Sequence, residues 1–90
     1  MPILRIGALA SGRGSNFQSI IDEIESQRLK AQIVLLITDN PSAFAIERAK
    51  KHSIEYLVMM PKGYKSRDDY FATIAEELKK RDVGLIVLAG

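Results

Sequence analysis

The sequence predicts an α/β fold, a Rossmann-like three-layer α/β/α domain built on a parallel sheet. Apolar segments alternate with amphipathic segments along all 90 residues. Residues 33–37 form an unbroken apolar run, which is typical of a strand covered on both faces. A loop rich in glycine and serine follows the first apolar segment. Strand and helix alternate three times before a final strand, and the predicted strand order is 3-2-1-4.

The first strand is predicted over residues 3–10, an apolar run interrupted only by Arg5 and Gly7. The first helix is predicted over residues 15–27. Its apolar side chains recur at helical spacing and form one stripe: Phe17, Ile20, Ile21 and Ile24.

The second strand is predicted over residues 31–38, around the unbroken apolar run. A turn of Asp, Asn, Pro and Ser follows at residues 39–42. The second helix is then predicted over residues 43–52, with Ser42 as its amino-terminal cap.

The third strand is predicted over residues 54–60. Ser66 and Asp69 stand three residues apart, as in a capping box, and predict a third helix that runs to about Arg81. The fourth strand is predicted over residues 83–88. Four side chains of the third helix are expected to face the core: Tyr70, Phe71, Ile74 and Leu78.

The charge pattern gives no sign of nucleic-acid binding. The net charge is +2, and the basic clusters at residues 50–51 and 79–81 end predicted helices, where cations complement the helix dipole. The chain has no cysteine, which excludes disulfides, cysteine-ligated zinc and a thiol nucleophile. Its apolar runs are too short to span a membrane, and no signal peptide is apparent. We therefore expect a soluble, cytoplasmic protein.

The loop at residues 11–16 (Ser-Gly-Arg-Gly-Ser-Asn) directly precedes the first helix. Gly12 and Gly14 permit a tight turn, the first helical amides favour an anion, and Ser15 and Asn16 add side-chain donors. These features suit a phosphate monoester. A plain strand-to-helix turn would use the same residues, so spacing alone leaves both interpretations open.

Two known phosphate loops do not match. A Walker A loop needs Lys before Ser15, and a dinucleotide fingerprint needs a small residue where Phe17 stands. Asp39 resembles a ribose-binding acid, but its place before Asn40-Pro41 favours a turn residue. A response-regulator receiver needs acidic residues at the ends of the first and third strands, which are absent.

Residues 11–18 (Ser-Gly-Arg-Gly-Ser-Asn-Phe-Gln) resemble the loop of the phosphoribosylglycinamide formyltransferase family. The resemblance continues over residues 38–49, 66–70 and 87–90, and so covers essentially the whole chain. It implies an amino-terminal half, residues 1–90, of a formyltransferase domain of purine synthesis. Members transfer a formyl group from 10-formyltetrahydrofolate, without a metal, to the amine of glycinamide ribonucleotide.

The resemblance also implies roles for individual residues. Gly14, Ser15 and Asn16 are expected to hold the substrate phosphate, Arg67 to lie near the ribonucleotide, and Gly90 to line the cleft by its backbone. The family's catalytic Asn, His and Asp, and most of its folate site, are expected beyond residue 90. No catalytic or folate-binding residue is therefore assigned within the chain.

His52 is the only histidine, and it ends the second helix, away from the expected ligand edge. We expect it to be structural. The fourth strand would be an exposed apolar edge, which predicts that the chain is truncated, inactive alone and able to self-associate. Two other interpretations stay open: a formyltetrahydrofolate hydrolase, which would have no need of a phosphate loop, and a non-catalytic phosphate-binding or interaction module.

Overall fold

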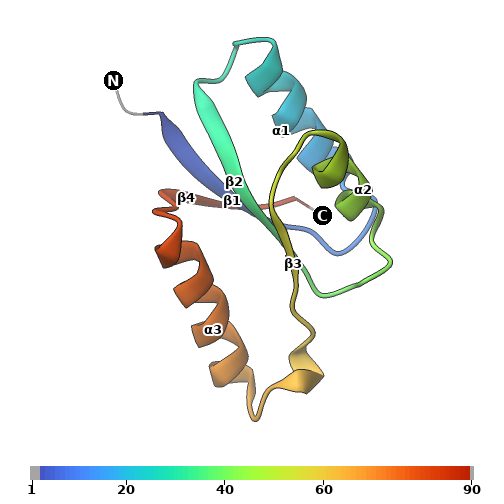
Figure 1. Cartoon of the computed structure of the whole chain (residues 1–90), viewed down its shortest axis with the longest axis vertical. Helices are drawn as coiled ribbons and strands as arrows, with labels where there is room; N and C mark the ends of the chain where they lie inside the picture. The colour runs from blue at the N-terminus through green and yellow to red at the C-terminus, as the bar shows by residue number, and fades with distance from the viewer. Residues whose placement is uncertain (1–2, 90) are drawn as a thin grey trace.

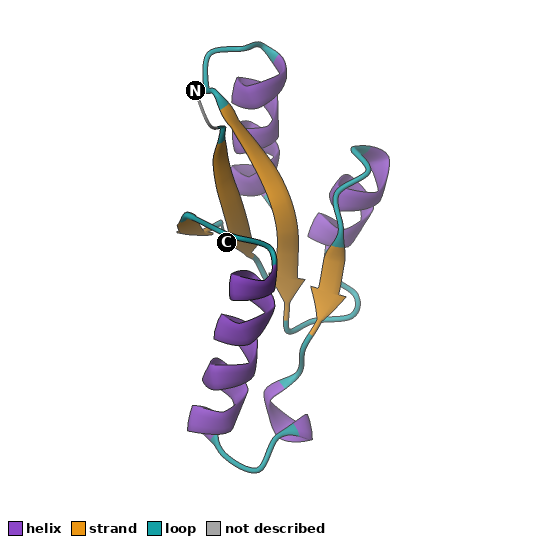
Figure 2. Cartoon of the chain, turned by 60° about the vertical axis from the view of Figure 1, so that its left-hand side comes forward, coloured by secondary structure: helices purple, strands orange, loops and turns teal. Residues whose placement is uncertain are grey.

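The computed structural model describes residues 3–89. Its four strands form one parallel sheet in the order β3-β2-β1-β4, which confirms the predicted topology. The arrowheads of β2 and β3 point the same way in Figure 2. In chain order the elements are β1 (Leu4–Leu9), α1 (Ser15–Glu25), β2 (Ala31–Thr38), α2 (Phe44–Lys51), β3 (Tyr56–Val58), the 3-10 helix η1 (Pro61–Gly63), α3 (Arg67–Lys80) and β4 (Leu85–Leu88).

Helices cover both faces of the sheet, α1 and α2 on one and α3 on the other (Figure 1). The core on the α1/α2 face centres on Phe17, whose side chain is fully buried against strand residues such as Ile6 and Leu36. The core under α3 joins Leu35 and Ile37 of β2 to side chains of the helix. Two separate cores confirm the three-layer architecture.

A register shift in the sheet explains the unbroken apolar run of β2. Ile6 of β1 pairs with Ile33, whereas the next residue, Gly7, pairs with Leu35, so Val34 is an extra residue. Ile33 therefore packs on the α1/α2 face, and Leu35 on the α3 face. Burial on both faces leaves no position for a charged side chain in the carboxyl-terminal half of this strand, residues 35–38.

The prediction that Phe71 faces the core is wrong: its side chain is 54% exposed. The buried stripe of α3 runs through Tyr70, Ile74 and Leu78, which are spaced four residues apart. Phe71 lies one residue, or about 100°, around the helix from that stripe, and its ring centroid is 5.5 Å from that of Tyr70.

The prediction that Ser42 caps the second helix is also wrong. Ala43 is the capping residue of α2, and no side chain accepts a hydrogen bond from the first turn. Instead, the backbone N–H of Ser42 donates to Oδ1 of Asn40 at 3.0 Å. Asn40 thus closes an Asx turn and delays the helix by one residue.

The start of α3 follows the prediction, because the Ser66 hydroxyl accepts a hydrogen bond from the Asp69 N–H at 3.1 Å. β3 and β4 are shorter than predicted, at three and four residues. β4 is an edge strand whose Leu85, Ile86 and Leu88 side chains are exposed. Self-association through this edge stays a prediction.

Candidate functional site: the carboxyl edge of the sheet

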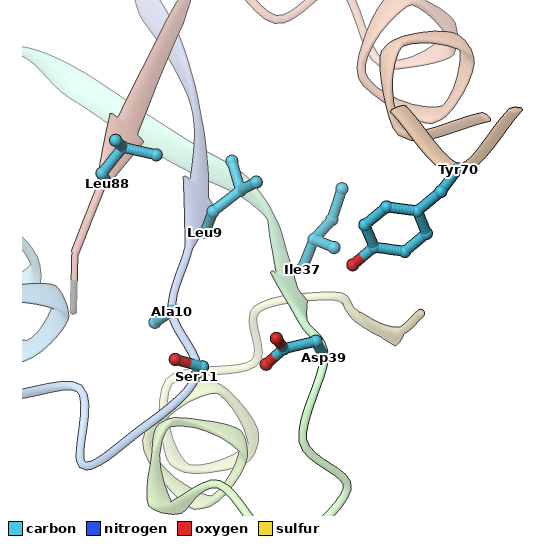
Figure 3. Close-up of a pocket in the computed structure, with 7 residues that line it drawn as sticks. All are labelled: Leu9, Ala10, Ser11, Ile37, Asp39, Tyr70 and Leu88. Atoms are coloured by element: carbon cyan, nitrogen blue, oxygen red, sulfur yellow. The ribbon is translucent and has the colours of Figure 1, made fainter. Parts of the chain in front are cut away.

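A cleft of about 290 Å³ opens at the carboxyl ends of β1, β2 and β4. This is the edge at which ligands bind in open α/β sheets, because loops from neighbouring strands meet there. Figure 3 shows seven side chains around it: Leu9, Ala10, Ser11, Ile37, Asp39, Tyr70 and Leu88. Its walls are mostly apolar, with polar groups from Ser11 and Asp39 on one side.

The glycine-rich loop leaves the cleft at Ser11 and ends at Gly14, the capping residue of α1. Gly14 has φ of 74° and ψ of 30°, a left-handed conformation that side chains other than glycine's rarely adopt. No side chain caps the helix. Its first backbone hydrogen bond runs from the Gln18 N–H to the Gly14 carbonyl oxygen. The amides of Ser15 and Asn16 precede that bond and stand at the positive end of the helix dipole.

Ser15 and Asn16 are both exposed, whereas Gly14 is buried against α2. None of the three lines the cleft itself. The structure therefore puts the predicted phosphate residues outside the cleft, three to five residues beyond Ser11 in the same loop.

Arg67 is the first residue of α3 and is exposed. It lines a second hollow, of about 470 Å³, which also contains Ser66, Tyr64 and Phe71. Leu9, Asp39 and Tyr70 line both hollows, so the two adjoin each other. Arg67 and the glycine-rich loop therefore lie along the same edge of the sheet, on opposite faces. Arg67 lines the second hollow, whereas Ser11 of the loop lines the cleft. Gly90, the fifth predicted site residue, lies outside the described residues.

Asp39 and Tyr70 are cleft residues that sequence reasoning did not select. Asp39 was predicted as a turn residue, but Asn40 makes the turn, and the Asp39 side chain points toward Ser11 across the cleft (Figure 3). Tyr70 is buried, and its hydroxyl donates to the Met59 carbonyl oxygen at 2.8 Å. An acidic residue directly after a buried strand was the available signal for Asp39. Tyr70 gave none, because its helical spacing only indicates a core position.

Burial, and to a lesser extent the charge of Asp39, raises the pKa of the Tyr70 phenol above its usual value. The phenol therefore stays neutral at physiological pH, and its only proton is already donated to Met59. Tyr70 serves as a wall of the cleft rather than as an acid or base.

His52 does not line the cleft. It caps the carboxyl end of α2, and its Nδ1 lies 2.8 Å from Oε2 of Glu25. Because a carboxylate only accepts hydrogen bonds, Nδ1 carries the proton. The remaining ring nitrogen, Nε2, then accepts from the Gln18 side-chain amide at 3.4 Å. His52 thus links α1 to α2, as the interpretation of a structural histidine requires.

Residues 3–89 contain no cluster of three or more His, Asp or Glu side chains that could hold a metal ion. Within the same range, no helix has an apolar stretch of the length needed to cross a bilayer.

The family model of formyl transferase matches residues 4–90. Phosphoribosylglycinamide formyltransferase of Bacillus subtilis (strain 168) is 36% identical over 86 residues, which cover 96% of this chain and 44% of that protein. The trifunctional purine biosynthetic protein adenosine-3 of Drosophila melanogaster is 39% identical over 88 residues, or 96% of this chain and 6% of that protein.

The fold also matches solved structures. Glycinamide ribonucleotide transformylase 1 from Symbiobacterium toebii superposes with a TM-score of 0.94 at 38% identity, covering 98% of this chain and 42% of that one. The chain therefore spans less than half the length of these relatives.

Proposed function

The chain belongs to the formyl transferase family, and we propose that it is the substrate-phosphate-binding half of a phosphoribosylglycinamide formyltransferase. The whole protein would transfer a formyl group from 10-formyltetrahydrofolate to the amine of glycinamide ribonucleotide. The residues of this chain would bind and orient the ribonucleotide. The groups that manage the amine's protons would lie in the part of the relatives' length that this chain does not span.

The observation that carries the proposal is the uncapped amino terminus of α1. The amides of Ser15 and Asn16 need an acceptor, and the helix dipole favours a negatively charged one. Gly14 lets the backbone reach this geometry with a φ of 74°. A phosphate monoester supplies three oxygens and the required charge, and the side chains of Ser15 and Asn16 add two donor groups.

The rest of the ribonucleotide would extend from the loop along the carboxyl edge of the sheet. The cleft at Ser11 and Asp39 leads to the hollow bordered by Arg67, so a ligand fixed at the loop has one continuous surface to follow. In this arrangement Arg67 would approach the ribonucleotide from the α3 side. Gly90 would contribute its backbone at the end of the chain.

An amide NMR titration of the 90-residue chain with glycinamide ribonucleotide tests this proposal. We expect the largest chemical-shift changes at Gly14, Ser15 and Asn16. The same molecule without its phosphate should bind about tenfold more weakly or not at all, because a charged acceptor is worth more than a neutral one. Equal affinity for the two ligands, or shifts confined to other residues, would overturn the proposed phosphate site.

A matched pair of serine variants sharpens the test, because Ser15 and Ser26 lie at opposite ends of α1. Ser15→Ala should weaken ribonucleotide binding by about threefold to tenfold, as expected for one hydrogen bond to a charged group. Ser26→Ala loses only a bond to the Glu23 carbonyl oxygen and should bind like the unsubstituted chain.

Phosphate binding also separates the proposal from formyltetrahydrofolate hydrolysis. A hydrolase uses water as its acceptor and has no ribonucleotide to hold. Binding of the ribonucleotide through residues 14–16 would therefore favour the transferase over the hydrolase.

A further inference from the structure

The carbonyl oxygens of residues 11–14 in the glycine-rich loop are all engaged in hydrogen bonds within the protein. Carbonyl oxygens of Ser11, Gly12, Arg13 and Gly14 each accept a hydrogen bond from elsewhere in the protein. Their donors are Asn40 Nδ2 at 3.2 Å, the Ala45 N–H at 3.3 Å, Arg48 Nε at 2.8 Å and the Gln18 N–H at 2.8 Å. An oxygen that faced a bound phosphate would repel it, so these four bonds matter to an anion site.

Arg48 provides the only charged donor among the four. Its Nε–H donates to the Arg13 carbonyl oxygen, and one terminal nitrogen donates to Oε1 of Gln18 at 3.2 Å. The guanidinium carbon also lies 4.8 Å from the centroid of the Phe44 ring. These three contacts hold a planar group, so Arg48 joins α2, α1 and the loop in one orientation.

The Gln18 amide is itself fixed by its other partners. Its Nε2 donates to Oδ1 of Asp22 at 3.0 Å and lies 3.4 Å from Nε2 of His52. Because both donors of the amide point toward these acceptors, its oxygen is left for Arg48. The orientation of Arg48 therefore rests on a network that reaches across both helices.

We propose that Arg48 is a positioning residue for the phosphate loop. Its hydrogen bond holds the Arg13 carbonyl oxygen against α2, so that the Ser15 and Asn16 amides face the ligand. This inference rests on the proposed function, because it assigns a purpose to the loop geometry. Arg48 acts through the backbone at Arg13, and no contact between its side chain and the ligand is required.

The first measurement needs no ligand. Amide hydrogen exchange and ¹⁵N relaxation of residues 12–16 are compared in the unsubstituted chain, Arg48→Met, Arg48→Lys and Lys51→Met. Lys51 is exposed, lies on the same helix and has no hydrogen bond or ion pair to any described residue, so Lys51→Met removes an equal charge without touching the loop. We expect Arg48→Met to raise amide exchange and mobility at residues 12–16, and Lys51→Met to leave them unchanged.

The second measurement is the affinity for inorganic phosphate, followed at the Ser15 and Asn16 amides. Arg48→Met should bind phosphate about tenfold more weakly, because binding would then have to order the loop that the Arg48–Arg13 hydrogen bond holds in place. Arg48→Lys should recover only part of that loss, because one ammonium cannot reproduce the planar fork that reaches both Arg13 and Gln18. If Arg48→Met does not fold, the loss of phosphate affinity is measured with Arg48→Lys instead.

The outcomes separate the inference from the proposed function. Absence of any phosphate effect at residues 14–16 in the unsubstituted chain would refute the proposed function. If phosphate binds but Arg48→Met and Lys51→Met behave alike, the positioning role is refuted and the phosphate site stands. Full recovery by Arg48→Lys would also refute it, because charge alone would then explain the effect.

Discussion

A Cβ atom at Gly14 would lie only 2.8 Å from Cβ of Ala45 and 3.0 Å from its Cα. The glycine-rich loop therefore rests directly on the first turn of α2. Two constraints meet at Gly14, because its φ of 74° also excludes most side chains. Contact between loop and helix, rather than turn geometry alone, requires glycine here.

Gly14→Ala should lower the free energy of unfolding by about 2–3 kcal/mol, through left-handed strain and displacement of α2. Gly63→Ala is the matched control, because nothing lies within 4 Å of a Cβ at that position and its φ is not positive. It should change stability by less than about 0.5 kcal/mol. Urea unfolding followed by circular dichroism measures both, and equal effects would contradict the contact.

Phe17→Ala and Phe71→Ala should differ sharply although the same side chain is removed. Phe17 is fully buried in the α1/α2 core, so its loss should cost about 3–5 kcal/mol, a large part of the stability of a small domain. Phe71 is 54% exposed, and its loss should cost less than about 1 kcal/mol. Thermal unfolding of the two variants distinguishes them, and similar melting temperatures would refute the assigned burial.

Ser66→Ala and Ser42→Ala compare two serines that each precede a helix. Ser66 accepts the Asp69 amide, so its replacement should destabilise the protein by about 1 kcal/mol. Ser42 caps no helix, and its backbone N–H remains available to Asn40 in the variant. Ser42→Ala should therefore be neutral within about 0.5 kcal/mol. If Ser42→Ala lowered the denaturant midpoint more than Ser66→Ala, Ser42 would be a helix cap, as the sequence predicts.

Stability should fall in acid through the ion cluster at Arg81. Its guanidinium lies 2.7 Å from Glu55 and 2.9 Å from Glu77, and hydrogen bonding to it holds the pKa of both carboxyls below the usual value. Carboxyls with a lowered pKa stabilise the fold above their unfolded pKa of about 4.3. That contribution is lost as pH falls through the lower folded values.

Arg81→Gln should therefore lower the melting temperature at pH 7 but much less at pH 3. Lys79→Gln removes the same charge from the end of α3, away from Glu55, and should show no such pH dependence. Melting curves at both pH values test the difference. An effect of Arg81→Gln that stays constant with pH would exclude the carboxyls as its cause.

The order of elements could be predicted from the sequence, and so could the position of residues 11–16 at the carboxyl edge of the sheet. Alternation of apolar runs with helical stripes is a local signal, and in parallel strands of the order 3-2-1-4 residues 11–16 follow β1 at its carboxyl end. The Ser66 cap was predictable for the same reason, since donor and acceptor lie three residues apart. Such features depend on neighbours along the chain.

Other features depend on residues far apart in the sequence. Asp39 and Tyr70 meet at one cleft, and Arg48 reaches the Arg13 carbonyl across 35 residues, because the sheet brings their elements together. The local pattern wrongly predicted that Phe71 is buried, because helical spacing does not show how wide a stripe of the helix the sheet covers. The sequence alone determined the order of the strands and helices and the residue types that the loop presents. The tertiary structure decided how that loop is held, because hydrogen bonds between distant elements form only when the sheet has packed.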